Sequence, residues 1–253
     1  MGQRRKTSPH PLSPSPFGRG GTRVKFTKQL LAWWARAARD LPWRRTRDPY
    51  RVLVSEFMLQ QTQVSRVAEY YPRFIERFPD IEALARAKPR AVREQWDGLG
   101  YYARASNLHA LARVVSKDHD GTLPDTPDEL ITLPGIGPYT AGAVACFAYE
   151  KPVPAVDTNV ARVIRRVFVG MRDAGYGMRG GGAASRIPHP ASRQIWELAR
   201  ALVPKNGRRA WTFNQAIMEL GALVCVARKP RCPVCPVRSQ CKTGRRQSAR
   251  LDG

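Results

Sequence analysis

Four cysteines lie close together near the carboxyl end of the chain, in the spacing C-x6-C-x2-C-x5-C: Cys225, Cys232, Cys235 and Cys241. Four thiolates from so short a segment can enclose an iron–sulfur cluster or a zinc ion, or can form two disulfides. Zinc usually takes paired C-x2-C units, and this run has one such pair. No apolar signal peptide opens the sequence, so we expect a reducing compartment, in which disulfides are rare. We therefore favour a [4Fe–4S] cluster over zinc.

Two carboxylates occupy positions that would give them different pKa values. Glu56 follows the apolar run 52–54 of an expected helix, where desolvation would raise its pKa. Asp157 precedes another apolar helix, whose dipole would keep it ionised. Hydrolysis of an N-glycosidic bond calls for such a pair, because an acid protonates the leaving base and a carboxylate stabilises the sugar cation. The alternatives are a partly exposed helical Glu and an ordinary Asp at a helix start.

A glycine-rich turn, residues 133–138 (LPGIGP), separates two expected helices. Paired glycines let the backbone come close to a phosphate, with the next helix's N-terminus facing the anion. A plain interhelical turn is the alternative. The formal net charge of +23 makes a nucleic acid the simplest partner, although membrane surfaces and acidic proteins also attract such a chain. The charge and the turn together favour a helix-hairpin-helix phosphate clamp.

Helical periodicity runs through the chain, with no alternating strand pattern and no internal repeat, so we expect an all-α fold. The expected helices cover about 27–38, 49–56, 64–78, 81–87, 89–96, 104–118, 127–130, 139–147, 158–167, 192–202 and 212–225. Residues 1–25 and 242–253 are basic and poor in apolar side chains, and we expect disordered tails there. The segment 170–190 is expected to be a surface loop. With no apolar run long enough for a bilayer, we expect a soluble cytoplasmic protein at the nucleoid.

Several motifs carry a resemblance to a known family. The turn, Asp157 and the cysteine run together resemble the endonuclease III superfamily of DNA glycosylases. Residues 41–44 (LPWR), 55–63 (SEFMLQQTQ), 98–104 (GLGYYAR) and 213–221 (FNQAIMELG) resemble its adenine-specific, MutY-type members. The resemblance covers roughly residues 26–241. It implies a helical barrel lobe, residues 48–157, and a lobe built from 26–47 and 158–241 that holds the [4Fe–4S] cluster.

The resemblance also implies roles for the candidate catalytic residues. Glu56 would be the general acid/base, Asp157 the cation stabiliser, and Asn159 the residue that orients Asp157. Bifunctional members carry a lysine where this chain has Tyr139, so the resemblance implies a monofunctional enzyme that uses water. Some thymine-mismatch enzymes share that tyrosine, and Glu56 is what separates them from adenine-removing members.

Further DNA contacts follow by motif. The adenine pocket would comprise Trp43, Arg44, Leu59 and Glu219. Gln61 and Tyr101 would insert into the duplex, with Thr62 and Leu99 beside the orphan base and Gly135 and Gly137 at a phosphate. Arg228, Lys229 and Arg231 would contact other phosphates. The alternative for Trp43, Leu99 and Tyr101 is core packing. The alternative for Arg228, Lys229 and Arg231 is a solvated basic turn.

The resulting hypothesis is a monomeric, monofunctional glycosylase acting on double-stranded DNA with an adenine mispaired with 8-oxoguanine or guanine. A thymine/uracil mismatch glycosylase and a non-catalytic iron–sulfur DNA-binding protein are the alternatives. Typical members continue into a second domain that recognises oxidised guanine. We expect this chain to lack it, since the sequence stops shortly after Cys241, which leaves the preference for 8-oxoguanine open.

Overall fold

The computed structural model describes residues 21–170 and 190–248, which are helical and contain no strand. The expected all-α fold is therefore confirmed. The first helices are α1 (Gly21–Ala37), α2 (Pro49–Leu59), α3 (Val64–Arg77), α4 (Ile81–Arg86), α5 (Pro89–Trp96) and α6 (Ala103–Asp118). They are followed by α7 (Pro127–Leu130), α8 (Pro138–Phe147), α9 (Thr158–Ile164), α10 (Pro190–Leu202), α11 (Gly207–Leu223) and α12 (Lys242–Ser248). Short 3₁₀ turns cover Pro42–Arg44, Cys232–Val234 and Arg238–Gln240, and a π-helical turn, Arg165–Val169, extends α9.

Side-chain caps determine where several helices begin, as the sequence predicts. Asp48 accepts a hydrogen bond from the Arg51 N–H at 2.8 Å, and proline follows it at the first position of α2. Thr126 accepts from the Glu129 N–H at 3.3 Å before α7. Asp157 caps α9 in the same way. These bonds satisfy donors that a helix leaves unpaired in its first turn.

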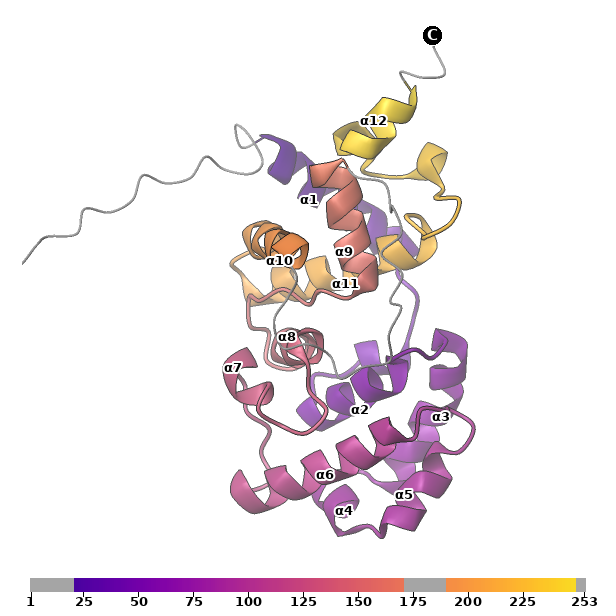
Figure 1. Ribbon diagram of the computed structural model, residues 1–253, viewed down its shortest axis with the longest axis vertical. Helices are drawn as coiled ribbons and strands as arrows, with labels where there is room; N and C mark the ends of the chain where they lie inside the picture. The colour runs from indigo at the N-terminus through magenta and orange to yellow at the C-terminus, as the bar shows by residue number, and fades with distance from the viewer. Residues whose placement is uncertain (1–20, 171–189, 249–253) are drawn as a thin grey trace, which may run out of the picture.

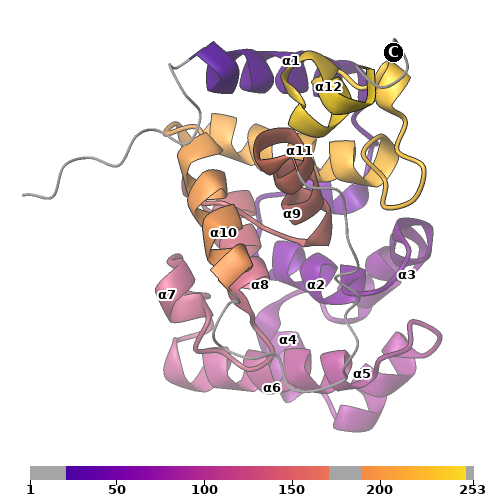
Figure 2. The ribbon, with the colours of Figure 1, turned by 45° about the horizontal axis from the view of Figure 1, so that its top comes forward.

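The helices gather toward two ends of an elongated molecule (Figure 1). At one end lie α1, α9, α10, α11 and α12, and at the other lie α3 to α6. Between them α2 packs on α8, while α11 packs on α9 and α1. Figure 2 shows α12 beside α1 at the first end. Glu56 therefore lies on a helix between the two ends, while Asp157 at the start of α9 and Glu219 on α11 belong to the first end. The division into lobes 48–157 and 26–47 plus 158–241 stays a proposal.

Two expectations about the tails differ from the structure. Helix α1 begins at Gly21, inside the expected tail 1–25, and buries Phe26 and Leu30 against its neighbours. Helix α12 occupies the start of the expected tail 242–253, because Thr243 is buried and donates to the Arg166 carbonyl at 2.8 Å. The rest of both tails, residues 1–20 and 249–253, and the expected loop from 171 to 189 lie outside the described residues. Among the described helices, none combines the length and apolar character needed to span a bilayer.

Candidate active site

Glu56 is a buried carboxyl group with one free oxygen. It lies on α2 with 3% of its surface exposed, and Oε2 has no hydrogen-bond partner among the described residues. Burial raises its pKa to about 7. A hydrogen bond from Tyr139 lowers this pKa, the charge of Asp157 raises it, and Arg44 lowers it. The group is thus poised to hold or release a proton near neutral pH.

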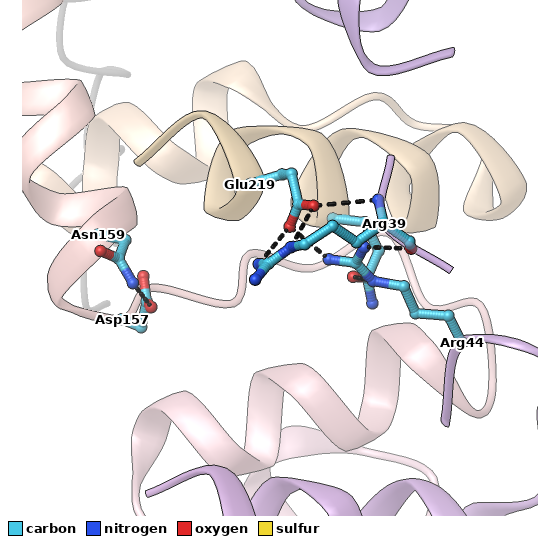
Figure 3. Close-up of polar contacts among 6 residues, drawn as sticks. Arg39, Arg44, Asp157, Asn159 and Glu219 are labelled. Carbon is cyan, nitrogen blue, oxygen red and sulfur yellow. Dashed lines mark hydrogen bonds and ion pairs between the residues drawn. The ribbon is translucent and has the colours of Figure 1, made fainter. Parts of the chain in front are cut away.

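Asp157 lies at the start of α9 and is held there from two sides. Its Oδ1 accepts from the Val160 N–H at 2.7 Å, and its Oδ2 accepts from Asn159 Nδ2 at 2.8 Å (Figure 3). Burial nevertheless raises its pKa, while these hydrogen bonds and the charge of Arg162 lower it. The expectation that Asp157 stays ionised remains a prediction, because burial opposes ionisation whereas the hydrogen bonds and the charge of Arg162 favour it.

Tyr139 is electrostatically coupled to both carboxylates. It lies in the first turn of α8, after the cap Gly137 and the helix-starting Pro138. Burial raises its pKa well above the usual value, and the charges of Glu56 and Asp157 raise it further. The phenol is therefore neutral, and the three side chains from α2, α8 and the start of α9 form one electrostatically coupled group.

The position of Asn159 depends on a glycine that sequence reasoning did not single out as functional. A Cβ built on Gly221 of α11 would lie 2.6 Å from the Cβ of Asn159. Only glycine lets the two helices approach this closely without displacing the asparagine that holds Asp157. Gly221 falls inside the motif 213–221, but only the packing of α11 on α9 gives it this role.

Glu219 forms the densest ion-pair network of the site (Figure 3). Its carboxylate accepts from Arg39 Nε at 2.7 Å and from Arg44 Nη2 at 2.9 Å. Arg44 also donates to Gln215 Oε1 at 2.8 Å. Burial alone would raise the pKa of Glu219, but the hydrogen bonds from the two arginines lower it to about 2. The structure thus brings Glu219 and Arg44 together and adds Arg39 and Gln215, which sequence reasoning missed because their partners are distant in the chain.

The two other expected pocket residues have different surroundings. Trp43 is buried, and its ring contacts Tyr71 edge to face with centroids 5.6 Å apart. This is the core packing that the sequence left as an alternative. Leu59 is half-buried at the end of α2, close in sequence to Glu56.

The expected inserting residues share an unusual backbone conformation. Gln61 and Tyr101 have φ angles of 55° and 49°, in the left-handed region that side chains other than glycine rarely adopt. Gln61 is exposed, and Tyr101 is 61% exposed, which excludes core packing for this tyrosine. Leu99 is buried, in agreement with the alternative of core packing, and Thr62 is half-buried.

The two glycines of the glycine-rich turn have different surroundings. Gly135 has a φ angle of 75°, and a Cβ there would lie 2.7 Å from the Cβ of Asn107. A Cβ on Gly137 would meet nothing within 4 Å, so the backbone before α8 faces open space. In the cysteine segment, Arg228, Lys229 and Arg231 are exposed, and no described carboxylate pairs with them.

Comparisons with known proteins show the family to which this sequence belongs. A family profile described as "HhH-GPD superfamily base excision DNA repair protein" matches residues 54–178. An adenine DNA glycosylase of Mycolicibacterium smegmatis is 48% identical over 85% of this chain and 68% of its own length. The human adenine DNA glycosylase is 42% identical over 87% of this chain and 40% of its own length. The chain belongs to the adenine DNA glycosylase family of the HhH-GPD superfamily.

Solved structures agree on the fold. A thermostable thymine-DNA glycosylase superposes with a TM-score of 0.76 and 32% identity, over 89% of this chain and 97% of that one. A non-covalent endonuclease III–DNA complex gives a TM-score of 0.70 at 22% identity, over 88% and 95%, and shows the fold alone.

The four cysteines line one cavity of about 230 Å³ between the π-helical turn Arg165–Val169, α11 and the loop from 225 to 241. None of them forms a disulfide. Burial raises the pKa of Cys235 to about 11, and the other three thiols raise it further, so the four groups are close to one another. Yet no three possible ligands in the described residues converge as closely as one metal ion requires. Four thiols that line one cavity form a donor set that a [4Fe–4S] cluster could use.

Proposed function

We propose that this protein removes adenine from double-stranded DNA in which the adenine is paired with 8-oxoguanine or guanine. Membership of the adenine DNA glycosylase family supports hydrolysis of the N-glycosidic bond in base excision repair. The observation that carries the proposal is the free Oε2 of buried Glu56, next to Tyr139 and coupled to Asp157. We expect the protein to act as a monomer at the nucleoid.

Glu56 supplies the proton in the proposed mechanism. Adenine leaves poorly unless one of its ring nitrogens is protonated, and a carboxyl group with a pKa of about 7 is partly protonated at neutral pH. Its free Oε2 provides the oxygen that can face the base. Tyr139 lowers the pKa of this carboxyl group, and its phenol offers no amine for a Schiff base.

Asp157 stabilises the sugar cation that forms as the base leaves. The Val160 N–H and Asn159 hold its two oxygens in place, so the carboxylate is oriented before the reaction. Water then attacks the sugar, with Glu56 as the base once it has given up its proton. This mechanism requires an acid with a raised pKa and a carboxylate whose oxygens are held by hydrogen bonds. The raised pKa of Glu56 and the two hydrogen bonds that Asp157 accepts support it.

The surroundings of this pair would recognise the extruded nucleotide. Glu219 fixes the guanidinium of Arg44, whose charge also lowers the pKa of Glu56, so we propose that Arg44 contacts adenine and Glu219 positions it. Trp43 and Leu59 would complete the pocket. Gln61 and Tyr101 would fill the space left by the base, with Thr62 and Leu99 behind them.

Gly135 and Gly137 would hold a DNA phosphate, and the exposed Arg228, Lys229 and Arg231 would bind others. We propose that Cys225, Cys232, Cys235 and Cys241 hold a [4Fe–4S] cluster, which would supply a rigid centre for the basic loop between them. The chain's own carboxylates carry out the hydrolysis.

A thymine or uracil mismatch glycosylase is the second candidate, because the structure of a thymine-DNA glycosylase is 32% identical to this chain. A panel of A:8-oxoguanine, A:G, T:G and U:G duplexes separates the two. Purified protein is incubated with each duplex, and strand cleavage after alkali treatment is measured. We expect cleavage of the adenine strands. Cleavage of the T:G or U:G duplexes alone would contradict the proposal and would favour a thymine or uracil mismatch glycosylase.

A further inference from the structure

Arg104 is a buried arginine on the first turn of α6, to which neither the motifs nor the comparisons assign a role. Its residue exposure is 7%, and burial lowers its pKa. A buried guanidinium is costly unless its N–H groups find acceptors. No carboxylate in the described part of the chain reaches it, so its acceptors must be uncharged oxygens.

Those oxygens come from two loops that are remote in sequence. From the end of α2, Nη1 donates to the carbonyls of Phe57 at 2.9 Å and Met58 at 2.8 Å. From the turn before α6, Nη2 donates to the carbonyl of Leu99 at 3.2 Å and to that of Gly100 at 3.0 Å. One planar group therefore ties the end of α2 to the turn 98–101.

Two further bonds relate this clamp to the exposed side chains. Nη1 donates to the carbonyl of Gln60 at 2.5 Å, in the peptide unit that precedes Gln61. The Gly100 carbonyl belongs to the peptide unit that precedes Tyr101. Gln61 and Tyr101 both have left-handed φ angles, which are strained for residues other than glycine and persist only where the surrounding structure imposes them. Arg104 therefore holds the peptide unit that precedes each of these two strained residues.

The remaining contacts of the guanidinium and of the turn strengthen the link. Nη2 donates to Thr62 Oγ1 at 3.0 Å, and the guanidinium carbon lies 5.4 Å from the centre of the Trp96 ring. Trp96 in turn donates to the Gly100 carbonyl at 3.2 Å. On the outer side, exposed Arg66 donates to the Gly98 carbonyl at 2.7 Å.

We propose that Arg104 is a positioning residue for base extrusion, which sets Gln61 and Tyr101 at a fixed separation so that both enter the duplex together. This inference rests on the proposed function, in which these two side chains insert into DNA. Arg104 does not contact the catalytic carboxylates; it acts through the two loops and through the Tyr101 ring, whose centre lies 5.7 Å from the guanidinium carbon. Lysine cannot replace it, since an ammonium has three donors and no planar fork to reach both loops.

A double-mutant cycle tests this mechanism. Each protein also carries Asp157→Asn to prevent cleavage, and the target adenine of an A:G duplex is replaced by 2-aminopurine, whose fluorescence rises on extrusion. The extrusion rate is measured for Arg104→Gln, for Gln61→Ala/Tyr101→Ala, and for the three changes together. We expect Arg104→Gln alone to slow extrusion about tenfold or more. In the protein that already carries Gln61→Ala/Tyr101→Ala, we expect Arg104→Gln to cause no further decrease in the extrusion rate. Arg113→Gln, exposed on the same helix, serves as the control and is expected to match the parent.

The outcomes distinguish the inference from the function on which it rests. If Gln61→Ala/Tyr101→Ala slows extrusion but Arg104→Gln slows it by the same factor with or without these changes, Arg104 acts elsewhere and the inference is wrong. If Gln61→Ala/Tyr101→Ala extrudes as fast as the parent, the inserting roles themselves are wrong and the inference falls with them. Should circular dichroism show that Arg104→Gln does not fold, Arg104→Lys takes its place in the same cycle, with the same expected result.

Discussion

The charge of Asp157 raises the pKa of Glu56, although the two residues come from different helices. Electrostatic coupling of this kind requires the carboxyl groups to be near one another inside the protein. Two carboxylates in one site tend to differ in protonation, since ionisation of one opposes ionisation of the other. Here Glu56 is the deeper group and holds a proton near neutral pH, while Asp157 accepts two hydrogen bonds.

The buried Glu56 should make stability depend on pH. Its pKa is about 4.5 in the unfolded chain and about 7 in the folded one, so the folded state binds the extra proton between these values. Unfolding free energy therefore falls as pH rises from 4.5 to 7, by roughly 3 kcal/mol at most. Glu56→Gln should remove this dependence, as measured by urea unfolding across that range. Glu76→Gln, exposed on α3, should retain it; equal curves for wild type and Glu56→Gln would contradict the assignment.

Tyr139→Phe should move the pH profile of adenine release upward. The wild-type rate is expected to decline above pH 7, as Glu56 loses its proton. The hydrogen bond from Tyr139 lowers this pKa, so its removal should raise the pKa and shift the decline to higher pH. Single-turnover rates at several pH values measure the shift. Tyr149→Phe, which loses a hydrogen bond to the Leu123 carbonyl, should leave the profile in place, and a downward shift for Tyr139→Phe would refute the argument.

Breaking the Glu219 network should destabilise the protein. Glu219→Gln leaves Arg39 and Arg44 without their shared carboxylate, and loss of one partner of a buried ion pair costs about 3–5 kcal/mol. Urea unfolding at pH 7 measures the loss. The wild-type contribution should disappear as pH falls from about 4.5 toward 2, because the folded pKa is lowered to about 2.

The matched control is Glu94→Gln, which removes an exposed ion pair with Arg90 within one helix. It should change stability by less than about 1 kcal/mol. Equal effects of the two substitutions would show that the Glu219 network contributes no more than a surface pair.

Purified protein should carry iron held by the four clustered cysteines. A [4Fe–4S] protein has broad brown absorbance, which a zinc protein lacks. Cys232→Ala should lose the colour and the iron measured by elemental analysis. Cys146→Ala should retain both, because this buried thiol accepts from Asn214 and does not line the cavity. Zinc in place of iron in the wild-type protein would overturn the cluster proposal.

Signals local in the chain predict much of the fold. The caps at Asp48 and Thr126, the turn around Gly135 and the apolar periodicity all lead to helices where the structure has them. The burial of Glu56 and its raised pKa also follow from its apolar neighbours, because a helix that is apolar around a carboxylate is typically buried on that face.

Features that depend on pairing between distant segments could not be predicted. Nothing near Glu219 indicates that Arg39 binds it, and a single arginine on a helix, such as Arg104, is usually solvated. The raised pKa of Asp157 likewise depends on burial by other helices, whereas the sequence shows only its cap position. Gly221 has a role only because α11 packs against Asn159.

The most direct test of the two-carboxylate mechanism is the single-turnover rate of adenine release from an A:G duplex by wild type, Glu56→Gln and Asp157→Asn. Binding to the same duplex is measured in parallel. Both variants should bind DNA as wild type does and release adenine about a hundredfold more slowly or worse, since each loses one half of the acid and cation-stabilising pair. Adenine release by either variant within about twofold of wild type would contradict the account.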